Sequence, residues 1–282
     1  MQEEWTIQSL LEWTTHYFNQ KNISAARLEA ELLLAQVLKQ DRIYLYANYD
    51  KPVNNWERSS YKEFVLRRVR GEPNAYITGQ KEFMSLNMKV NPAVLIPRPE
   101  TELLVEETLI ICKERGKVRI CDIGTGSGAI AVSLAYYCPQ AQVYAGEISQ
   151  SALAVAAENA NIHGVQVDFR QGDLLEPFFE EEPFDIIVAN LPYIAANEYE
   201  ELMREVRDYE PAQALLAGYD GLDLYRRMIP QARKLLLSGG YIIIEIGWSQ
   251  SAQVIEMLAG FSQVQVKKDF AGIDRLVKAR KV

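Results

Sequence analysis

Four consecutive residues, Asn190-Leu191-Pro192-Tyr193, have the chemistry to hold a planar group that carries an NH₂. An amide or ring NH₂ is a poor nucleophile because its lone pair is delocalised. The side-chain oxygen of Asn190 and the backbone carbonyl of Leu191 can each accept one hydrogen and so orient that lone pair toward an electrophile. Pro192 fixes the turn, and the Tyr193 ring can stack on the planar group. A lone tetrapeptide of this kind is also common as a turn packed on a core.

A glycine-rich loop, Gly124-Thr125-Gly126-Ser127-Gly128, directly follows the apolar run from Val118 to Ile123. Glycine lets the backbone turn sharply and approach a ligand where a Cβ would collide. A helix that begins here would present unpaired backbone N–H groups to that ligand. The spacing is G-x-G-x-G, which differs from the G-x-G-x-x-G of dinucleotide sites. The alternative is a tight strand–helix connection, but the loop favours a cofactor site.

Three acidic residues lie at or just after the ends of successive predicted strands. Asp122 precedes the first glycine by two positions, where a carboxylate could receive the ammonium of a methionine moiety. Glu147 stands about 20 residues beyond the loop, near the position that binds ribose hydroxyls in related folds. Asp173 could accept from an adenine amino group, with Leu174 on the ring, although Gly-Asp is also an ordinary turn. We therefore predict S-adenosylmethionine as cofactor, with S-adenosylhomocysteine as product, and contacts from these residues, the loop and Asn190.

Methyl transfer from a sulfonium needs no strong base. Alignment at near-attack distance supplies much of the acceleration, and the proton can leave afterwards. The residues expected to act in the reaction and to hold the substrate are therefore Asn190, Leu191, Pro192 and Tyr193.

Alternating strands and helices are the elements that would position these residues. Apolar strands are expected at 118–123, 142–147, 165–170, 184–189 and 241–246, with a terminal antiparallel hairpin at 264–268 and 275–279. Helices are expected at 128–137, after a cap at Ser149 or Ser151, and at 222–237, which should end at Ser238-Gly239-Gly240. This pattern predicts an α/β fold with a seven-stranded Rossmann-like class I methyltransferase sheet.

The preceding part of the chain has a different pattern. Apolar residues in the first ~75 positions recur with the helical period, and Ser24 could cap the second helix. We predict a small N-terminal helical bundle at 1–74, a β-hairpin linker at 75–99 and the methyltransferase domain at 100–282. The basic run Arg67-Arg68-Val69-Arg70 is interpreted as a solvated helix C-terminus that complements the helix dipole.

Composition narrows the classes of function. The formal net charge of −8 argues against an extensive phosphate-binding surface, so a nucleic-acid partner is disfavoured. Three cysteines (Cys112, Cys121, Cys138) and two histidines (His16, His163) lack metal-ligand spacing, so no metal is expected, and Cys121 should be a buried, inert thiol. No apolar run reaches the roughly 18 residues of a membrane span. The acidic start Met1 to Trp5 does not look like a signal peptide, so a cytoplasmic location is expected.

The combination of motifs resembles the release-factor glutamine N5-methyltransferase family (HemK-type protein methyltransferases), over essentially the whole chain. The segments that carry the resemblance are Glu72 to Gly79, Glu82-Phe83, Val94 to Glu102, Asp122 to Gly128, Asn190 to Tyr193 and Asp220 to Asp223. The run from Ile96 to Glu102 is the most specific of these. The resemblance implies methylation of the glutamine in the Gly-Gly-Gln motif of peptide chain release factors, with Asn190 to Tyr193 holding the amide. It also implies that the N-terminal domain helps to dock the protein substrate.

Two positions depart from the family pattern. The family usually has Pro where Leu191 stands, and a backbone carbonyl contact should tolerate the change. It usually has Asp where Glu147 stands, and the longer side chain can still reach a ribose. The run Arg98 to Glu102 has no role that the sequence reveals, apart from packing beside the methionine end of the cofactor.

Two other functions remain open. Asn-Leu-Pro-Tyr is also the form found in ribosomal RNA dimethyladenosine enzymes, and adenine carries a similarly conjugated NH₂. The acidic charge and the absence of a domain after the sheet argue against such an adenine-N6 methyltransferase. A binding or scaffold protein without catalysis is the other alternative, but it need not keep Asp122, Glu147, Asn190 and Tyr193 together.

Overall fold

The computed structural model describes residues 5–282. Residues 1–4, on which the expected lack of a signal peptide partly rests, lie outside this range. The chain forms two compact units: one contains the chain up to Gly79 with Arg204–Tyr209, and the other contains Gln80–Met203 with Glu210–Val282. Within the described range, every helix is too short or too polar to traverse a lipid bilayer.

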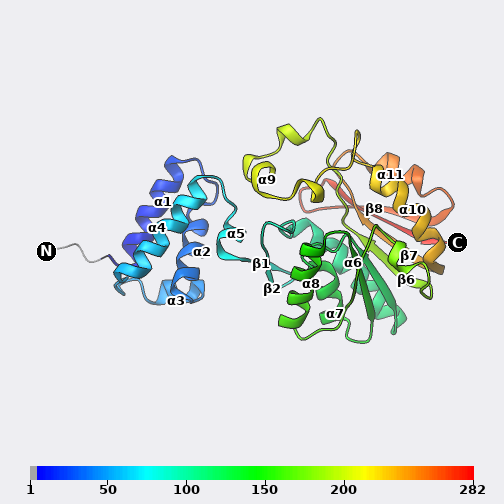
Figure 1. The fold of residues 1–282 in the computed structure, drawn as a ribbon, viewed down its shortest axis with the longest axis horizontal. Helices are drawn as coiled ribbons and strands as arrows, with labels where there is room; N and C mark the ends of the chain where they lie inside the picture. Colours follow the sequence, from blue (N-terminus) through cyan, green and yellow to red (C-terminus); the bar gives the residue numbers. More distant parts are fainter. Residues whose placement is uncertain (1–4) are drawn as a thin grey trace. The chain divides into compact units, whose positions relative to one another are not determined.

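The first unit is a helical bundle, as predicted (Figure 1). Its core contains Leu11, Phe18, Leu34 and Tyr61, all fully or almost fully buried. The helices are α1 (Ile7–Gln20), α2 (Ala26–Leu38), α3 (Arg42–Ala47), α4 (Asn55–Val69), α5 (Asn74–Thr78) and α9 (Arg204–Tyr209).

Two local predictions for this unit are wrong. Ser24 does not cap α2, because the chain enters that helix through a left-handed turn at Ala25 (φ +51°) without a side-chain cap. Arg68 is not solvated but 7% exposed. Its guanidinium lies 2.8 Å from a carboxylate oxygen of Glu29 and 2.8 Å from one of Glu205. Because Glu205 is on α9, this buried arginine helps to hold a distant chain segment in the first unit.

The second unit begins with the predicted hairpin, which is confirmed at Gln80–Phe83 (β1) and Leu86–Lys89 (β2). A 3₁₀ turn, η1 (Pro99–Thr101), leads into α6 (Glu102–Arg115).

The predicted seven-stranded sheet is also confirmed in the described residues, with the order β5-β4-β3-β6-β7-β9-β8. Strands β3 to β7 run parallel to one another, and β9 lies antiparallel between β7 and β8. The strands are β3 (Arg119–Ile123), β4 (Gln142–Glu147), β5 (Asp168–Gln171), β6 (Phe184–Ala189), β7 (Leu236–Glu245), β8 (Phe261–Lys268) and β9 (Asp274–Lys281).

The predicted end of the helix before β7 is wrong. Helix α10 (Asp223–Leu235) ends at Leu235, and the glycines at 239 and 240 lie within β7. A Cβ at Gly240 would lie 2.9 Å from the backbone oxygen of Asp185 on the neighbouring strand. The glycine therefore permits close approach of two strands and does not terminate the helix.

Strand β5, the third strand of the sheet in chain order, starts later than predicted, at Asp168.

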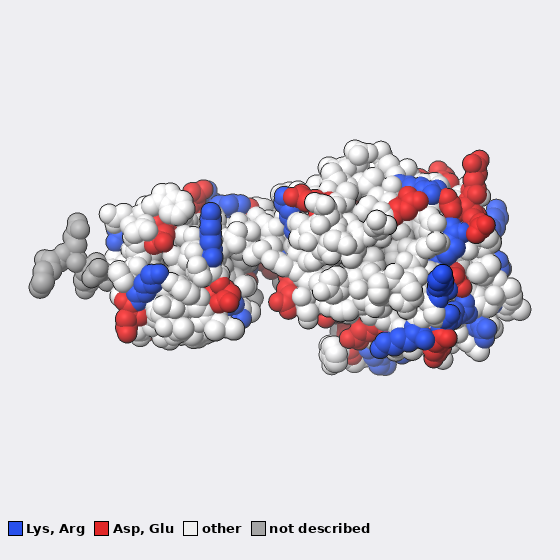
Figure 2. Space-filling model, turned by 90° about the horizontal axis from the view of Figure 1, so that it is seen from below, with Lys and Arg blue, Asp and Glu red and all other residues white. Residues whose placement is uncertain are grey.

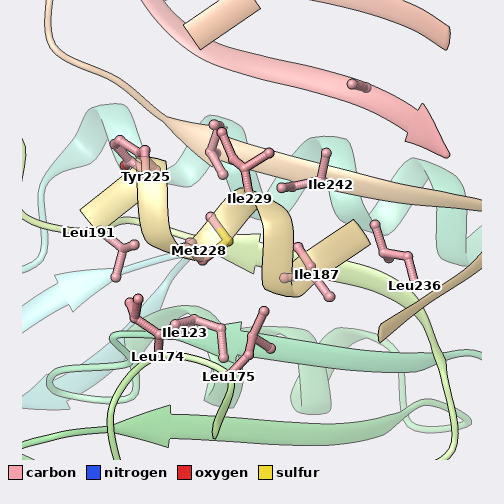
Figure 3. Packing of buried hydrophobic residues seen from close by; sticks show 14 of the residues in the cluster. Ile123, Leu174, Leu175, Ile187, Leu191, Tyr225, Met228, Ile229, Leu236 and Ile242 are labelled. Atoms are coloured by element: carbon pink, nitrogen blue, oxygen red, sulfur yellow. The ribbon is translucent and has the colours of Figure 1, made fainter. Parts of the chain in front are cut away.

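Helices cover both faces of the sheet (Figure 1). Side chains of β6 alternate: Ile186 and Val188 pack with α6 and α7 (Ala129–Tyr137), whereas Ile187 and Ala189 pack with α10 and α11 (Ser251–Met257). Figure 3 shows Met228 of α10 between Leu191 and Ile187. This double burial explains why the central strands are continuous apolar runs.

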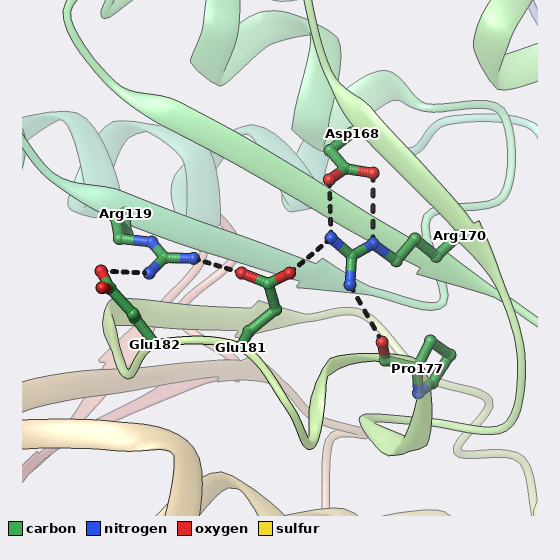
Figure 4. A network of polar contacts seen from close by, with 6 residues as sticks. All are labelled: Arg119, Asp168, Arg170, Pro177, Glu181 and Glu182. Atoms are coloured by element: carbon green, nitrogen blue, oxygen red, sulfur yellow. Dashed lines mark hydrogen bonds and ion pairs between the residues drawn. The ribbon is translucent and has the colours of Figure 1, made fainter.

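An ion-pair network ties β3 and β5 to the segment before β6 (Figure 4). Glu181 accepts from Arg119 at 2.8 Å and from Arg170 at 2.6 Å. These hydrogen bonds hold the pKa of the Glu181 carboxyl below its usual value. Both guanidiniums also lie over the Tyr144 ring of β4, 4.9 and 5.7 Å from its centroid. None of these residues is in the wall of the site described below, so the network stabilises the sheet without entering that site.

The strand order creates a switch point between β3 and β6. The chain continues from β3 to β4 on one side and returns to β6 on the other, with Ile123 paired beside Ala189. Ligands of open parallel sheets bind where such adjacent strands diverge at their carboxyl ends. The glycine loop and the Asn190 motif are the segments that leave these two ends.

Truncation of Met228 tests the packing of α10 on the sheet. Met228→Ala should lower the free energy of unfolding by about 2–5 kcal/mol, because it leaves a cavity among fully buried neighbours. Urea denaturation of the full chain measures the change. The exposed Ile255→Ala on α11 is the control and should change stability by less than about 0.5 kcal/mol. Equal midpoints for the two variants would contradict the packing.

Candidate functional site

A cavity of about 550 Å³ lies at the carboxyl edge of the sheet, within the second unit. It brings together most of the residues selected from the sequence. Those that line it are Gly124, Thr125, Gly126, Ser127, Glu147, Asp173, Leu174, Asn190, Leu191 and Pro192. Three selected residues, Asp122, Gly128 and Tyr193, are not in its wall.

The glycine loop adopts a backbone that other residues rarely take. Gly124, Gly126 and Gly128 have φ values of +72°, +55° and +79°. A Cβ at Gly124 would lie 2.8 Å from Cδ2 of Leu191, and one at Gly128 would lie 3.0 Å from Cα of Ala156. Gly124 is therefore required for the approach of the two loops, whereas Gly128 serves the contact with helix α8 (Gln150–Ile162).

Glu147 fastens the glycine loop to the end of β4. Its carboxylate accepts from the backbone N–H of Gly126 and from that of Ser149, both at 2.9 Å. Each carboxylate oxygen has a second lone pair, so Glu147 can hold the loop and still accept from a ligand in the cavity. Ser149 also caps α8 through Ala152, as one of the two predicted caps.

Asp122 occupies a different place from the expected one. It is fully buried behind the loop, where one carboxyl oxygen accepts from the Thr125 hydroxyl at 2.6 Å. The other oxygen has no hydrogen-bond partner among the described residues. Burial raises the pKa of this carboxyl to about 7, and the nearby charge of Glu147 adds to the shift. The expected contact with an ammonium group in the cavity is therefore replaced by support of the loop from behind.

The turn after β5 contributes Asp173 and Leu174 to the cavity. Leu174 is buried with a left-handed backbone (φ +51°). Asp173 forms an ion pair with Arg227 of α10, which also lines the cavity. Sequence analysis missed Arg227, because an arginine on an amphipathic helix has the pattern of an ordinary solvent-facing residue.

The Asn190 motif is anchored by groups on three other segments. Nδ2 of Asn190 donates to Oγ1 of Thr101 at 3.1 Å, and the Thr101 hydroxyl donates to Oε2 of Glu245 at 2.7 Å. The Leu191 side chain is buried in the core shown in Figure 3. The backbone oxygen of Tyr193 accepts from Gln250 at 2.9 Å.

Tyr193 is oriented toward Glu245. Its hydroxyl lies 3.4 Å from Oε1 of that carboxyl, and burial raises the pKa of the phenol above its usual value. The ring is absent from the cavity wall, so the predicted stacking on a planar substrate has no support in this arrangement.

The segment without an assigned role in the sequence, Arg98 to Glu102, lies at the site. Arg98 and Thr101 line the cavity, and Arg98 donates to buried Glu210 at 2.5 Å. Glu102 accepts from the backbone of Met84 at 2.7 Å. Sequence reasoning also missed Glu245, which ends β7 as Glu147 ends β4. The signal in the sequence that could have identified Glu245 is an acidic residue at the end of an apolar strand.

Comparison with known proteins identifies two family matches. Residues 9–79 match the model described as the PrmC N-terminal domain, and residues 120–209 match a methyltransferase domain.

Curated relatives extend over nearly the whole chain. A release factor glutamine methyltransferase of Geobacter sulfurreducens is 45% identical over 280 residues, covering 99% of this chain and 98% of the relative. One of Rhodopirellula baltica is 39% identical over 287 residues, covering 98% and 97%. Among solved structures, a methyltransferase from Pyrococcus furiosus has a TM-score of 0.51 with 19% identity, covering 79% of this chain and 98% of that one. The last similarity concerns the fold alone.

The buried Asp122 predicts a pH-dependent stability. Its pKa rises from 3.8 when unfolded to about 7 when folded. Folding therefore takes up a proton between these values, and the stability contributed by Asp122 is lost as the pH rises toward 7. The stability of Asp122→Asn relative to the original chain should increase from pH 5 to pH 7 by at most roughly 1.4 kcal/mol per unit. Thermal unfolding at both pH values measures this, and a difference independent of pH would contradict the assignment.

Proposed function

The chain belongs to the release factor glutamine methyltransferase family, and we propose that it transfers a methyl group from S-adenosylmethionine to the glutamine amide of release factors. The acceptor is N5 of the glutamine in the Gly-Gly-Gln motif. The observation that carries this proposal is the Asn190 motif beside the glycine loop in one cavity. In this proposal, the glycine loop holds the cofactor and the Asn190 motif holds the substrate amide.

The residues of the cavity fit the cofactor. A volume of about 550 Å³ lies within the usual range of roughly 300–1,000 Å³ for small-molecule sites. The space in front of Gly124 would be reduced by any side chain there, since its Cβ would meet Leu191. When bound, S-adenosylmethionine supplies an electrophilic sulfonium methyl group.

Glu147 would accept hydrogen bonds from the ribose hydroxyls. Its carboxylate is held by two backbone N–H groups and lines the cavity, so it is already oriented. Its negative charge disfavours a ligand with a 2′-phosphate. Asp173 and Leu174 would hold the adenine, with Arg227 fixing the Asp173 carboxylate.

Asn190 and Leu191 would orient the substrate amide. The side-chain oxygen of the first and the backbone carbonyl of the second would accept the two amide hydrogens and leave the nitrogen lone pair facing the methyl group. A backbone contact would also account for tolerance of Leu at position 191. In the transfer, an N–C bond forms, the S–C bond breaks with its electron pair left on sulfur, and the nitrogen releases one proton to water.

The first unit is the proposed docking domain for the release factor. Its match to the PrmC N-terminal domain supports this assignment. We retain the division at residues 1–74, 75–99 and 100–282 as part of the proposal, with the cytoplasm as the location of the reaction.

The charges on the face shown in Figure 2 give no specific support for a nucleic-acid substrate. On the face shown in Figure 2, Lys and Arg of the larger unit lie among Asp and Glu and do not form a continuous basic stripe. Such a stripe is the usual electrostatic footprint of nucleic-acid binding.

Substitution of Glu147 tests the cofactor site. Glu147→Ala should weaken S-adenosylmethionine binding about ten- to hundredfold. The substitution removes the carboxylate that would accept from the ribose hydroxyls and that holds the glycine loop. Glu147→Asp, the usual family residue, should bind within about threefold of the original chain. Isothermal titration calorimetry measures both, with the exposed Glu158→Ala as control. Unchanged binding by Glu147→Ala would refute the ribose contact.

Substitution of Asn190 tests the reaction. The chain should add one methyl group to the Gly-Gly-Gln glutamine of a recombinant unmethylated release factor, as measured by peptide mass spectrometry. Asn190→Ala should reduce the rate at least about a hundredfold, because the amide loses an orienting acceptor. Asn161→Ala, an exposed asparagine on α8, is the matched control. Cofactor binding without methylation by the original chain would remove release factors as substrate.

A further inference from the structure

Three side chains from separate segments form one hydrogen-bonded chain, and two of them, Asn190 and Thr101, line the cavity. Asn190 follows β6, Thr101 ends η1 and Glu245 ends β7. The register of β6 and β7, with Ala189 beside Ile244, places the first and last of these at neighbouring strand ends. The bonds are Asn190 Nδ2 to Thr101 Oγ1 at 3.1 Å and Thr101 Oγ1 to Glu245 Oε2 at 2.7 Å.

The donor-to-acceptor direction of these hydrogen bonds is determined by the number of protons available. A carboxylate can only accept, so Glu245 requires the single hydroxyl proton of Thr101. The Thr101 oxygen can then only accept from Asn190, and this selects the NH₂ end of the Asn190 amide. The oxygen end, which has almost the same shape as the NH₂ end, must face the other way. A buried carboxylate thus fixes the orientation of a side chain that it does not touch.

We propose that Glu245, acting through Thr101, is a positioning residue that keeps the amide oxygen of Asn190 directed at the substrate amide. The inference rests on the proposed function, because only an NH₂ substrate needs an acceptor there. With the amide reversed, two NH₂ groups would face one another and the substrate would be repelled.

The surroundings of Glu245 make this orientation sensitive to pH. The side chain is 2% exposed, and its backbone carbonyl accepts from the Tyr225 hydroxyl of α10. The groups that face its carboxyl are Thr101 and Glu100 of η1, Tyr193 after β6, and Arg275 of β9. Burial raises its pKa to about 7, against the opposing effects of Thr101 and Arg275.

Protonation of Glu245 would reverse the donor-to-acceptor direction of these hydrogen bonds. A protonated Glu245 can donate to Thr101, which frees the hydroxyl proton of Thr101 to donate in turn to Asn190. The Asn190 oxygen then turns toward Thr101 and away from the substrate. The acceptor is therefore presented above about pH 7 and withdrawn below it.

Kinetics of two Thr101 variants test this relay, the hydrogen bonds that run from Asn190 through Thr101 to Glu245, in the full-length protein. Thr101→Val keeps the shape of the side chain but removes the hydroxyl, so kcat for release-factor methylation should fall about ten- to hundredfold. The dissociation constant of S-adenosylmethionine should stay within about twofold. Thr101→Ser restores the hydroxyl and should keep kcat within about threefold of the original chain. Equal loss in the valine and serine variants would overturn the proposal.

The pH profile separates positioning from a general structural effect. For the original chain, kcat should fall as the pH decreases below about 7, approaching tenfold per unit. Glu245→Gln cannot titrate and should lose this acid limb whatever its absolute kcat. Asp122→Asn, which removes the other buried carboxyl with a pKa of about 7, should retain the limb at saturating cofactor. An acid limb that persists in Glu245→Gln would overturn the proposal.

A measurement without substrate distinguishes failure of the relay from failure of the proposed function. In NMR spectra of the ligand-free protein, the side-chain NH₂ of Asn190, assigned by its loss in Asn190→Ala, should shift with a midpoint near pH 7. The shift should vanish in Glu245→Gln. If it does so while no release factor is methylated, the relay stands and the substrate is wrong. If methylation occurs but the NH₂ signal is independent of pH and of Glu245, the relay is wrong and the function stands.

Discussion

The close approach of the loops after β3 and β6 is the constraint on which the rest of the site depends. The two strands are neighbours, with Ile123 beside Ala189, so their loops leave the sheet at the same edge. A Cβ at Gly124, whose φ is +72°, would lie 2.8 Å from Cδ2 of the buried Leu191, so the two loops could not approach this closely without a shift. A glycine at this position is therefore a steric requirement of the fold as well as of ligand approach. Because Leu191 packs against the glycine loop, the neighbouring Asn190 is held beside that loop. One packing contact therefore positions both segments that line the cavity, the glycine loop and the Asn190 motif.

The ionisable groups support this contact from behind. Asp122 holds Thr125 of the glycine loop, and Glu245 holds Thr101 against Asn190. Both carboxyls are buried, and burial raises the pKa of each to about 7. A buried carboxyl is costly when it is charged, so such groups persist where their hydrogen bonds define an arrangement that apolar residues could not. Glu147 is the contrasting case, because it accepts from two backbone N–H groups and lines the cavity.

The sequence predicts the sheet and the glycine loop well because their signals are local. A buried strand is recognised as an apolar run, and a glycine loop at its end indicates that the backbone approaches another segment or a ligand closely. Tertiary partners are not local, and this is where the predictions failed. Arg68 has the pattern of a solvated helix end, yet Glu205, far along the chain, is its partner. Asp122 was expected to face the ligand, but it is fully buried behind the glycine loop, where it accepts from Thr125. Thr101 and Glu245 are 144 positions apart, and only the tertiary packing of η1 against the end of β7 brings them together.

The proposed reaction also explains where these groups lie. A glutamine amide has no acidic proton that must be removed before attack, so a strong base beside the nitrogen would add little. The site must instead supply acceptors in a fixed direction, and an asparagine can present either end with equal ease. Selection between the two ends has to come from its hydrogen-bond partner, and that partner has to be held by another. For each protonation state of Glu245, the hydrogen bonds among Asn190, Thr101 and Glu245 have only one donor direction. The presence or absence of a single buried proton therefore determines which end of the Asn190 amide faces the substrate.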